Sequence, residues 1–286
     1  METKNAFIEQ ANLGENKLWQ YIVGFVVVLL GLILFSYPQV LVTDLHTQKP
    51  TVASHWYLMI AILSFIGGIL ALWFWLSQMH RRPLVSLITP NSSVNWTRVL
   101  YSGLLWFGCT VVIEMVFYGF DPSMYRFSLN LEQWIPTFVV GIIFIPIQSS
   151  CEELIFRGYL LQGIGSRNIV VGVLVSSILF GLMHSFNPET QKVGFALAMS
   201  YYISVGLFFA LLTYFDQKME LALGIHASNN IYSFLFVSYP DSALPSPSVF
   251  SLTSLNFSLM ILGWGIAVVL YVLIARKVFH LKFGTN

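Results

Sequence analysis

Polar side chains that can support chemistry lie in stretches of the chain that are otherwise apolar. They are Glu114, Glu152, Glu153, Arg157, His184, His226 and the amide Asn230. An ionisable side chain at membrane depth costs at least about 2.5–3.5 kcal/mol on insertion scales, so each of these residues needs a reason to be there. A carboxylate with two imidazoles can activate water, hold a zinc ion or relay protons.

Spacing gives the two adjacent glutamates different roles. Glu152 and Glu153 are consecutive, so about 100° of helical rotation points them in different directions and prevents a close carboxylate pair. Glu153 precedes Arg157 by four residues, which is the favourable order for an ion pair along one helical face. Each partner then cancels much of the other's burial cost. Glu152 is left without a local cationic partner.

The two histidines lie in different apolar stretches. His226 and Asn230 are four residues apart, so their side chains share one helical face about 6 Å apart along the axis. His184 follows Phe180 by four residues, and Gly181 between them allows another helix to approach closely. Both histidines also have a structural interpretation, because His and Asn form hydrogen bonds between membrane helices. Spacing alone leaves the two interpretations open.

The composition indicates that lipid surrounds most of the chain. The sequence has 286 residues, of which 56% are apolar and 9% charged, whereas soluble domains are about 25% charged. The net charge of +1 argues against a nucleic-acid partner. Cys109 and Cys151 fall inside apolar stretches, where we expect them to be small buried hydrophobes. Eight stretches are candidates for membrane-spanning helices: Trp19–Tyr37, Trp56–Gln78, Val99–Phe117, Trp134–Gly163, Ile169–Phe186, Gly194–Phe215, Leu221–Val237 and Ser254–Ala275.

These stretches predict an all-α, polytopic membrane helix bundle with about eight transmembrane helices. We divide it into residues 1–133, with three transmembrane helices and peripheral loops, residues 134–237, with the polar residues at 152–230, and residues 238–286, with an external loop and a last transmembrane helix. No small-residue cleavage site follows the first stretch, so we expect a retained anchor rather than a signal peptide. The fourth stretch is about 30 residues long and must tilt, kink near Pro136 or Pro146, or project from the membrane.

The distribution of Lys and Arg predicts the orientation. If the amino terminus is cytoplasmic, eleven of the fourteen Lys and Arg residues lie on the cytoplasmic side and three on the other. Both termini are therefore expected in the cytoplasm, and we expect the bacterial plasma membrane as the location. This orientation places the polar residues in the cytoplasmic half, so a substrate is expected to enter from the cytosol or laterally from lipid.

Three sequence motifs carry a family resemblance. They are C-E-E-L-I-F-R-G-Y at 151–159, F-G-L-M-H at 180–184 and H-A-S-N-N at 226–230. They resemble, in order, the E-E-x-x-x-R, F-x-x-x-H and H-x-x-x-N motifs of the CAAX prenyl protease and bacteriocin-processing family of intramembrane endopeptidases. The resemblance covers residues 134–237 and implies hydrolysis of a membrane-associated or lipidated protein or peptide.

The resemblance also implies a role for each motif residue. Glu152 and His184 would activate water, and His226 with Asn230 would stabilise the oxyanion. Arg157 would neutralise Glu153 or contact a substrate carboxylate. Zinc at Glu152, His184 and His226 is the rival mechanism, but the chain has no H-E-x-x-H helix, and we favour catalysis without a metal or other cofactor.

Two other functions remain open on the sequence alone. The chain could be a catalytically idle membrane scaffold of the same family, although all four motif residues named for catalysis are present. It could also be a proton-coupled transporter, because intramembrane Glu and His build proton relays. Glu114 fits either the protease or the transporter interpretation, or simply pairs with an Arg or Tyr. The oligomeric state is not predicted.

Overall fold

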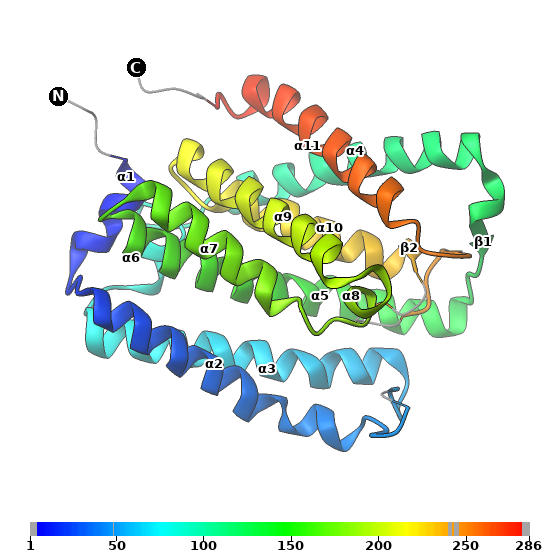
Figure 1. Cartoon of the computed structure of the whole chain (residues 1–286), viewed down its shortest axis with the longest axis horizontal. Helices are drawn as coiled ribbons and strands as arrows, with labels where there is room; N and C mark the ends of the chain where they lie inside the picture. The colour runs from blue at the N-terminus through cyan, green and yellow to red at the C-terminus, as the bar shows by residue number, and fades with distance from the viewer. Residues whose placement is uncertain (1–4, 48, 240–241, 243–245, 282–286) are drawn as a thin grey trace.

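The molecule is an elongated and mostly helical bundle. The computed structural model describes residues 5–47, 49–239, 242 and 246–281. Most of its helices run along the long axis, with both ends of the chain at one end of the bundle and a small sheet at the other (Figure 1). We call these the terminal end and the sheet end.

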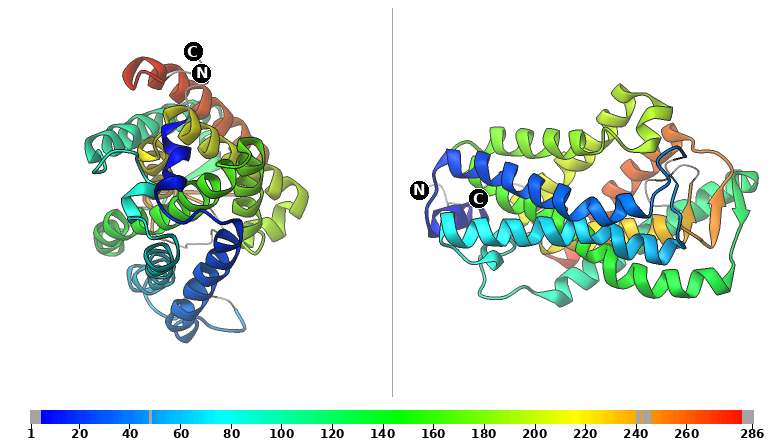
Figure 2. Two further views of the ribbon diagram at one scale, coloured as in Figure 1. Left: turned by 90° about the vertical axis from the view of Figure 1, so that its left-hand side faces the viewer. Right: turned by 90° about the horizontal axis from the view of Figure 1, so that it is seen from below.

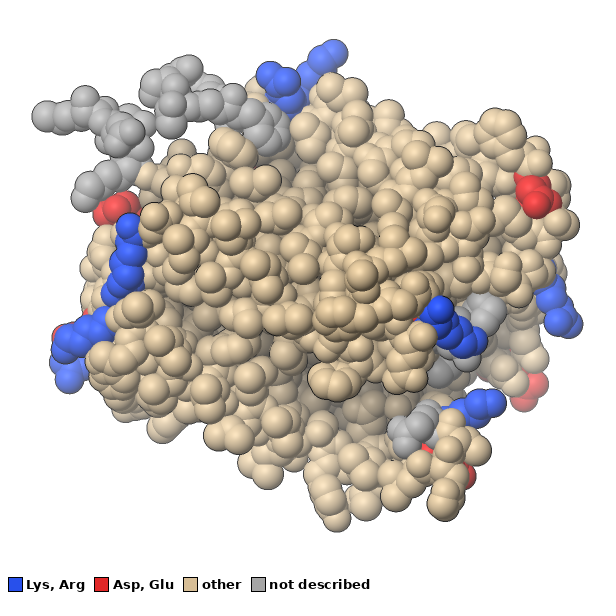
Figure 3. All heavy atoms as spheres, in the orientation of Figure 1, with Lys and Arg blue, Asp and Glu red and all other residues tan. Residues whose placement is uncertain are grey.

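Six helices are long and apolar enough to cross a membrane, judged by length and composition within the described residues. They are α2 (Leu18–Leu41), Ser54–His80 (α3, Ser54–Trp75, with the π-helical η2, Leu76–His80), α4 (Trp96–Phe120), Leu131–Gly165 (α5, η5 and α6), α9 (Phe195–Asp216) and α11 (Phe257–Val278). The broad central surface in Figure 3 carries no Lys, Arg, Asp or Glu. This arrangement indicates an integral multi-pass membrane protein.

Two of the eight predicted helices are shorter than a span requires. Helix α7 (Ile169–Met183) has 15 residues and α10 (Glu220–Leu235) has 16. Helix α10 packs between α4 and α5 inside the bundle, whereas α7 packs against α9 and exposes one apolar face. All eight helices thus lie where the sequence predicts them, and six meet the length expected of a span.

Asparagine side chains begin several of these helices. Asn130 accepts hydrogen bonds from the backbone N–H groups of Glu132 and Gln133, and Asn168 accepts one from that of Val171. Such caps satisfy N–H groups that have no partner inside the helix. They fix where α5 and α7 begin, and therefore the depth of Glu152 and His184.

The helices form three groups across the bundle. Helices α2 and α3 lie together on one side and α4 and α11 on the opposite side, with α5, α7, α9 and α10 between them (Figures 1 and 2). The remaining short helices lie before or between the long ones. They are α1 (Ala6–Glu9) and η1 (Gln10–Leu13) before α2, η3 (Leu84–Leu87) between α3 and α4, η4 (Pro122–Met124) after α4, and α8 (Pro188–Val193) between α7 and α9.

A small sheet departs from the predicted all-α fold. Strands β1 (Tyr125–Phe127), β3 (Phe250–Leu252) and β2 (Val237–Ser238) lie in that order, with β1 antiparallel and β2 parallel to β3. Strands of two or three residues are too short to show an alternating pattern, so the sequence does not reveal them. The sheet ties the segments after α4 and α10 to the start of α11.

The fourth helical stretch changes its winding next to the motif glutamates. Helix α5 (Leu131–Glu153) contains Pro136 and Pro146 and continues as the π-helix η5 (Leu154–Leu161), then as α6 (Gln162–Gly165). All eight residues of η5 are buried. Because π-helical turns are rare and occur frequently at functional sites, the change of winding directly after Glu153 makes this region a candidate functional site.

Helices α4 and α10 approach so closely at Gly224 that no side chain fits. A Cβ atom on Gly224 would lie 2.2 Å from the carbonyl oxygen of Val99 and 2.9 Å from the backbone nitrogen of Gly103. We therefore expect Gly224→Ala to lower the free energy of unfolding by about 1–3 kcal/mol, because the two backbones must separate. The unfolding temperature in detergent measures the effect. Gly265→Ala in α11 is the control, because its Cβ would meet nothing within 4 Å, and equal melting of both variants would contradict the expectation.

Candidate active site

The predicted ion pair between Glu153 and Arg157 is confirmed. The Glu153 Oε1 and Arg157 Nη1 atoms are 2.9 Å apart, and both side chains are fully buried. The guanidinium also lies over the rings of Phe180, 4.3 Å from its centroid, and Phe209, 5.1 Å from its centroid. The cation is thus held by one carboxylate and two aromatic faces, which compensate for its burial.

His226 lies between the two motif glutamates. Its Nδ1 atom is 2.7 Å from Glu153 Oε1, and its Nε2 atom is 3.4 Å from Glu152 Oε2. An ionised carboxylate only accepts hydrogen bonds, so Nδ1 donates to Glu153 Oε1, whereas Nε2 approaches Glu152 Oε2 without forming a hydrogen bond to it. Arg157 and the Nδ1 of His226 thus both lie against Glu153 Oε1, which lowers the cost of burying that carboxylate in the bundle.

Gln148 joins Glu152 to Asn230 and was missed by the sequence analysis. Its Nε2 donates to Glu152 Oε1 at 2.5 Å, and its Oε1 accepts from Asn230 Nδ2 at 2.9 Å. Asn229 donates in turn to Asn230 Oδ1 at 3.3 Å. The spacing could have identified Gln148, because an amide four residues before Glu152 shares its helical face.

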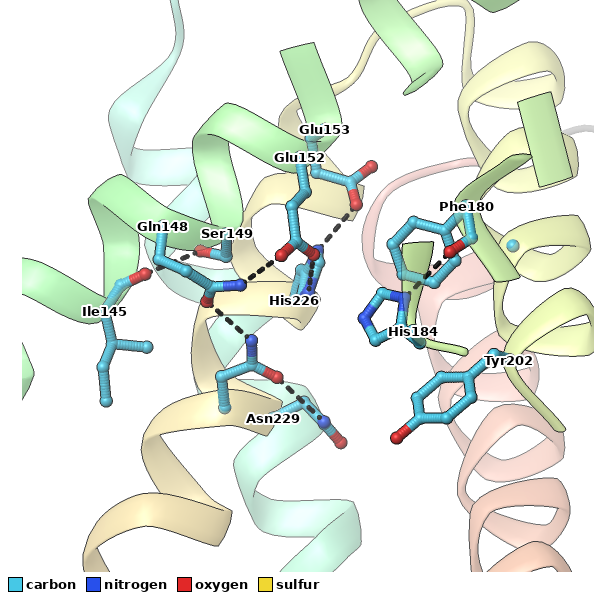
Figure 4. A network of polar contacts seen from close by, with 12 residues as sticks. Ile145, Gln148, Ser149, Glu152, Glu153, Phe180, His184, Tyr202, His226 and Asn229 are labelled. Carbon is cyan, nitrogen blue, oxygen red and sulfur yellow. Dashed lines mark hydrogen bonds and ion pairs between the residues drawn. The ribbon is translucent and has the colours of Figure 1, made fainter. Parts of the chain in front are cut away.

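His184 approaches from the opposite side of this network (Figure 4). Its Nδ1 donates to the carbonyl oxygen of Phe180 at 2.8 Å, because a carbonyl can only accept. A neutral ring therefore presents Nε2 as a proton acceptor. The ring also stacks on Tyr202, with centroids 4.4 Å apart and planes at 22°. No hydrogen bond or ion pair joins His184 to Glu152 within the described part of the chain.

A cavity of about 310 Å³ reaches this region from the sheet end. Its wall includes Gln148, His184 and Asn230, together with Val237 of β2 and Leu252 of β3. Asn229 also lines the cavity, whereas Glu152, Glu153, Arg157 and His226 are not among its lining residues. A ligand in the cavity would thus meet Gln148, His184 and Asn230 first.

The structure brings together five of the six predicted site residues in one bonded network and places His184 across from it. The five are Glu152, Glu153, Arg157, His226 and Asn230. Glu114 is separate, and its Oε2 accepts a hydrogen bond of 2.5 Å from Tyr125, one of the partners expected for it. His184 and Asn230 at the cavity wall, with Glu152 and His226 next to them, are groups that can polarise water and stabilise a developing oxyanion.

The same geometry bears on the zinc alternative. In the portion of the chain that the structure describes, no three His, Cys, Asp or Glu side chains form a group that could hold a metal ion. His226 uses both ring nitrogens toward Glu152 and Glu153, and His184 uses Nδ1 toward a backbone carbonyl. As arranged, these side chains do not fit a His₂Glu zinc site.

Comparisons with known proteins agree with the motif analysis. The family model described as "Type II CAAX prenyl endopeptidase Rce1-like" matches residues 131–232. The chain is 30% identical over 268 residues to the uncharacterized protein YyaK of Bacillus subtilis (strain 168), covering 88% of this chain and 89% of YyaK. No solved structure matches the chain.

Proposed function

The chain belongs to the family of Rce1-like type II CAAX prenyl endopeptidases, and from this premise we propose that it is an intramembrane endopeptidase. It would hydrolyse a peptide bond of a membrane-associated or lipidated protein or peptide. The observation that carries the proposal is the network of Glu152, His226 and Asn230 facing His184 beside a cavity. A catalytically idle scaffold would not need a carboxylate, two imidazoles and an amide gathered beside one cavity.

The proposed mechanism begins with Glu152 as the general base. Its carboxylate takes a proton from water while the water oxygen attacks the carbonyl carbon, and the Nε2 of His184 shares that proton. His226 and Asn230 donate hydrogen bonds to the oxygen on which negative charge develops. When the carbon–nitrogen bond breaks, the proton passes to the departing amine. Glu153 holds the His226 ring in position through Nδ1.

Gln148 supports the assignment of Asn230 as an oxyanion donor. Its side-chain carbonyl accepts the same Asn230 N–H that the proposal assigns to the attacked carbonyl. The amide of Gln148 thus resembles a peptide carbonyl seated at that donor. A substrate carbonyl that replaces it would also release the Gln148 N–H from Glu152, which exposes the general base to the cavity.

Replacing Asn230 tests the oxyanion role. We expect Asn230→Ala to lower kcat by about 10²–10³-fold with little change in KM or expression, because one donor to the transition state is lost. Asn230→Asp should be no better, because its carboxylate repels the developing charge. The assay compares detergent-purified variants on a cleavable membrane peptide, with Asn91→Ala, an exposed asparagine, as the control. Wild-type kcat in Asn230→Ala would remove this residue from the mechanism.

We also propose that no metal takes part. The proposal is supported by the engagement of His226 with both glutamates and by the separate position of His184. Activity should persist after exhaustive chelation and should not increase when zinc is added. Loss of activity on chelation with recovery on addition of zinc would establish the metal-dependent alternative.

A transporter would instead move protons across proteoliposome membranes without cleaving peptide.

The orientation in the membrane is a further part of the proposal. With both termini cytoplasmic, the cavity opens on the external side, because it reaches the site from the sheet end. We expected cytoplasmic termini and also a substrate that reaches the site from the cytosol. For a substrate that uses this cavity, only one of these two expectations can be correct. The positions of Lys and Arg favour cytoplasmic termini.

Cysteine labelling decides between these orientations. We expect Ser92→Cys, near the terminal end, to be protected from an impermeant maleimide in intact cells and Thr47→Cys, in the α2–α3 loop, to be labelled. Both native side chains are exposed, and the native Cys109 and Cys151 are buried, so the background should be low. The reverse pattern would place the termini outside and open the cavity to the cytoplasm.

A further inference from the structure

Glu189 is a buried acid to which the proposed mechanism gives no role. It lies in α8 at the sheet end and is 3% exposed. Its Oε1 accepts hydrogen bonds from Tyr202 at 2.5 Å and from Asn187 at 3.0 Å. Its Oε2 is buried and has no hydrogen-bond partner among the residues that the structure describes. Anchoring the Tyr202 ring explains Oε1 but leaves Oε2 unexplained, and a buried carboxylate oxygen without a partner is costly.

Glu189 lines the same cavity as His184 and Asn230. Glu114 also lines it, while the described part of the wall contains no Lys or Arg. A neighbouring hollow, which shares Phe117 with the cavity wall, adds Asp121. The space in front of the proposed catalytic residues is therefore bordered by carboxylates without a cationic side chain in its described wall.

The pKa values of two tyrosines outside the helices, Tyr239 and Tyr125, are raised in part by these acids. Burial raises the pKa of the Tyr239 hydroxyl, and the negative charge of Glu189 raises it further. Burial likewise raises the pKa of Tyr125, and its hydrogen bond to Glu114 adds to the shift. Both tyrosines line the cavity. Glu189 and Glu114 thus each raise the pKa of a different tyrosine in the cavity wall.

Aromatic side chains complete a wall that suits an organic cation. Trp106, Tyr201, Tyr202, Tyr232 and Trp264 all line the cavity. The faces of Trp and Tyr attract ammonium and guanidinium groups, and they also contact the alkyl stem of Lys or Arg. An ammonium group donates three hydrogen bonds and accepts none, which matches the bare Oε2 of Glu189.

We propose that this cavity selects polypeptide segments that carry a Lys or Arg side chain close to the scissile bond, with Glu189 as the specificity-determining residue and Glu114 as a second carboxylate. This inference rests on the proposed endopeptidase function. The charged head pairs with Glu189, and the peptide bond beside it lies near His184 and Asn230. A substrate carboxylate at the same position would be repelled.

A lysine scan measures both selectivity and catalysis. The probes are capped, otherwise neutral and apolar peptides in which one lysine occupies successive positions, with matched sets containing norleucine or glutamate. Binding is measured on the Glu152→Gln variant in proteoliposomes, and cleavage on the wild type. We expect one lysine position to bind about tenfold or more tightly than norleucine, and glutamate there to bind more weakly still.

Glu189→Gln tests the residue while preserving its structural role. The amide oxygen still accepts from Tyr202 and Asn187, so the His184 support stays in place, but the charge at Oε2 is gone. We expect the lysine preference to disappear and cleavage of the norleucine peptide to continue. Glu132→Gln, an exposed acid at the start of α5, is the matched control and should keep the preference.

The outcomes separate this inference from the proposed function. Equal binding of the lysine and norleucine sets at every position would overturn the inference whether or not peptides are cleaved. Selectivity for lysine that survives Glu189→Gln unchanged would remove Glu189 from it. Selective binding that Glu189→Gln abolishes, with no cleavage of any peptide by the wild type, would support the acidic site and refute the endopeptidase function.

Discussion

Glu152→Gln is expected to lower kcat by about 10³–10⁴-fold while leaving the amount of folded protein near that of the wild type. The amide is not a base, so water is no longer deprotonated as it attacks. The fold should tolerate the change, because a glutamine side chain can still bond Gln148 and His226.

The assay for Glu152→Gln uses purified protein and a cleavable membrane peptide, with yield measured on the same preparations. Glu132→Gln is the control, because it makes the same chemical change at an exposed position. A rate within threefold of the wild type at equal yield would contradict the role of Glu152 as base. A large loss of folded protein would instead assign it to the structural part of the network.

Glu153→Gln is expected to destabilise the fold by about 3–5 kcal/mol, because it leaves the fully buried Arg157 without a carboxylate partner. The same change removes the acceptor at Nδ1 of His226, so activity should fall with the yield. Glu153 and Glu152 are adjacent, yet the two variants should fail in different ways. Monodisperse yield in detergent and the unfolding temperature measure the difference.

A double variant provides the sharper control for Glu153. Arg157→Met combined with Glu153→Gln removes the unpaired cation, so folded yield should recover although activity should not. If the Glu153→Gln variant folds as well as the wild type, other groups compensate for the cost of burying the Arg157 charge. The rings of Phe180 and Phe209 would then be the first to consider, because the guanidinium lies over both.

The sequence predicted the parts of the fold that depend on local periodicity and hydropathy. The eight predicted helices match observed ones within a few residues, and the Glu153–Arg157 pair is confirmed because four residues make one helical turn. The sequence could not place Glu153 against His226, because their contact joins residues 73 apart in the chain. Only the packing of α10 against α5 reveals it.

The residues that sequence analysis missed share a physical reason. Gln148 shares a helical face with Glu152, but its contact with Asn230 on α10 appears only in the structure, and Glu189 becomes a candidate only through its partners and the cavity wall. Glu189 also lies in a connecting helix of six residues, where an acid normally contacts solvent. Its burial follows from the packing of α8 against α9. Long-range packing, rather than local pattern, decides these roles.

The short helix α7 has a consequence for the surrounding lipid. Its 15 residues rise about 22 Å, whereas a bilayer's hydrocarbon layer is about 30 Å thick. Leu174, Ile178 and Leu182 are exposed along its outer face, where lipid chains would contact them in a membrane. Hydrophobic mismatch of this size thins the adjacent leaflets, because polar helix ends draw headgroups and water inward. His184 is the C-cap residue of this helix, so a thinned bilayer would bring water to the residue for which we propose a role in hydrolysis.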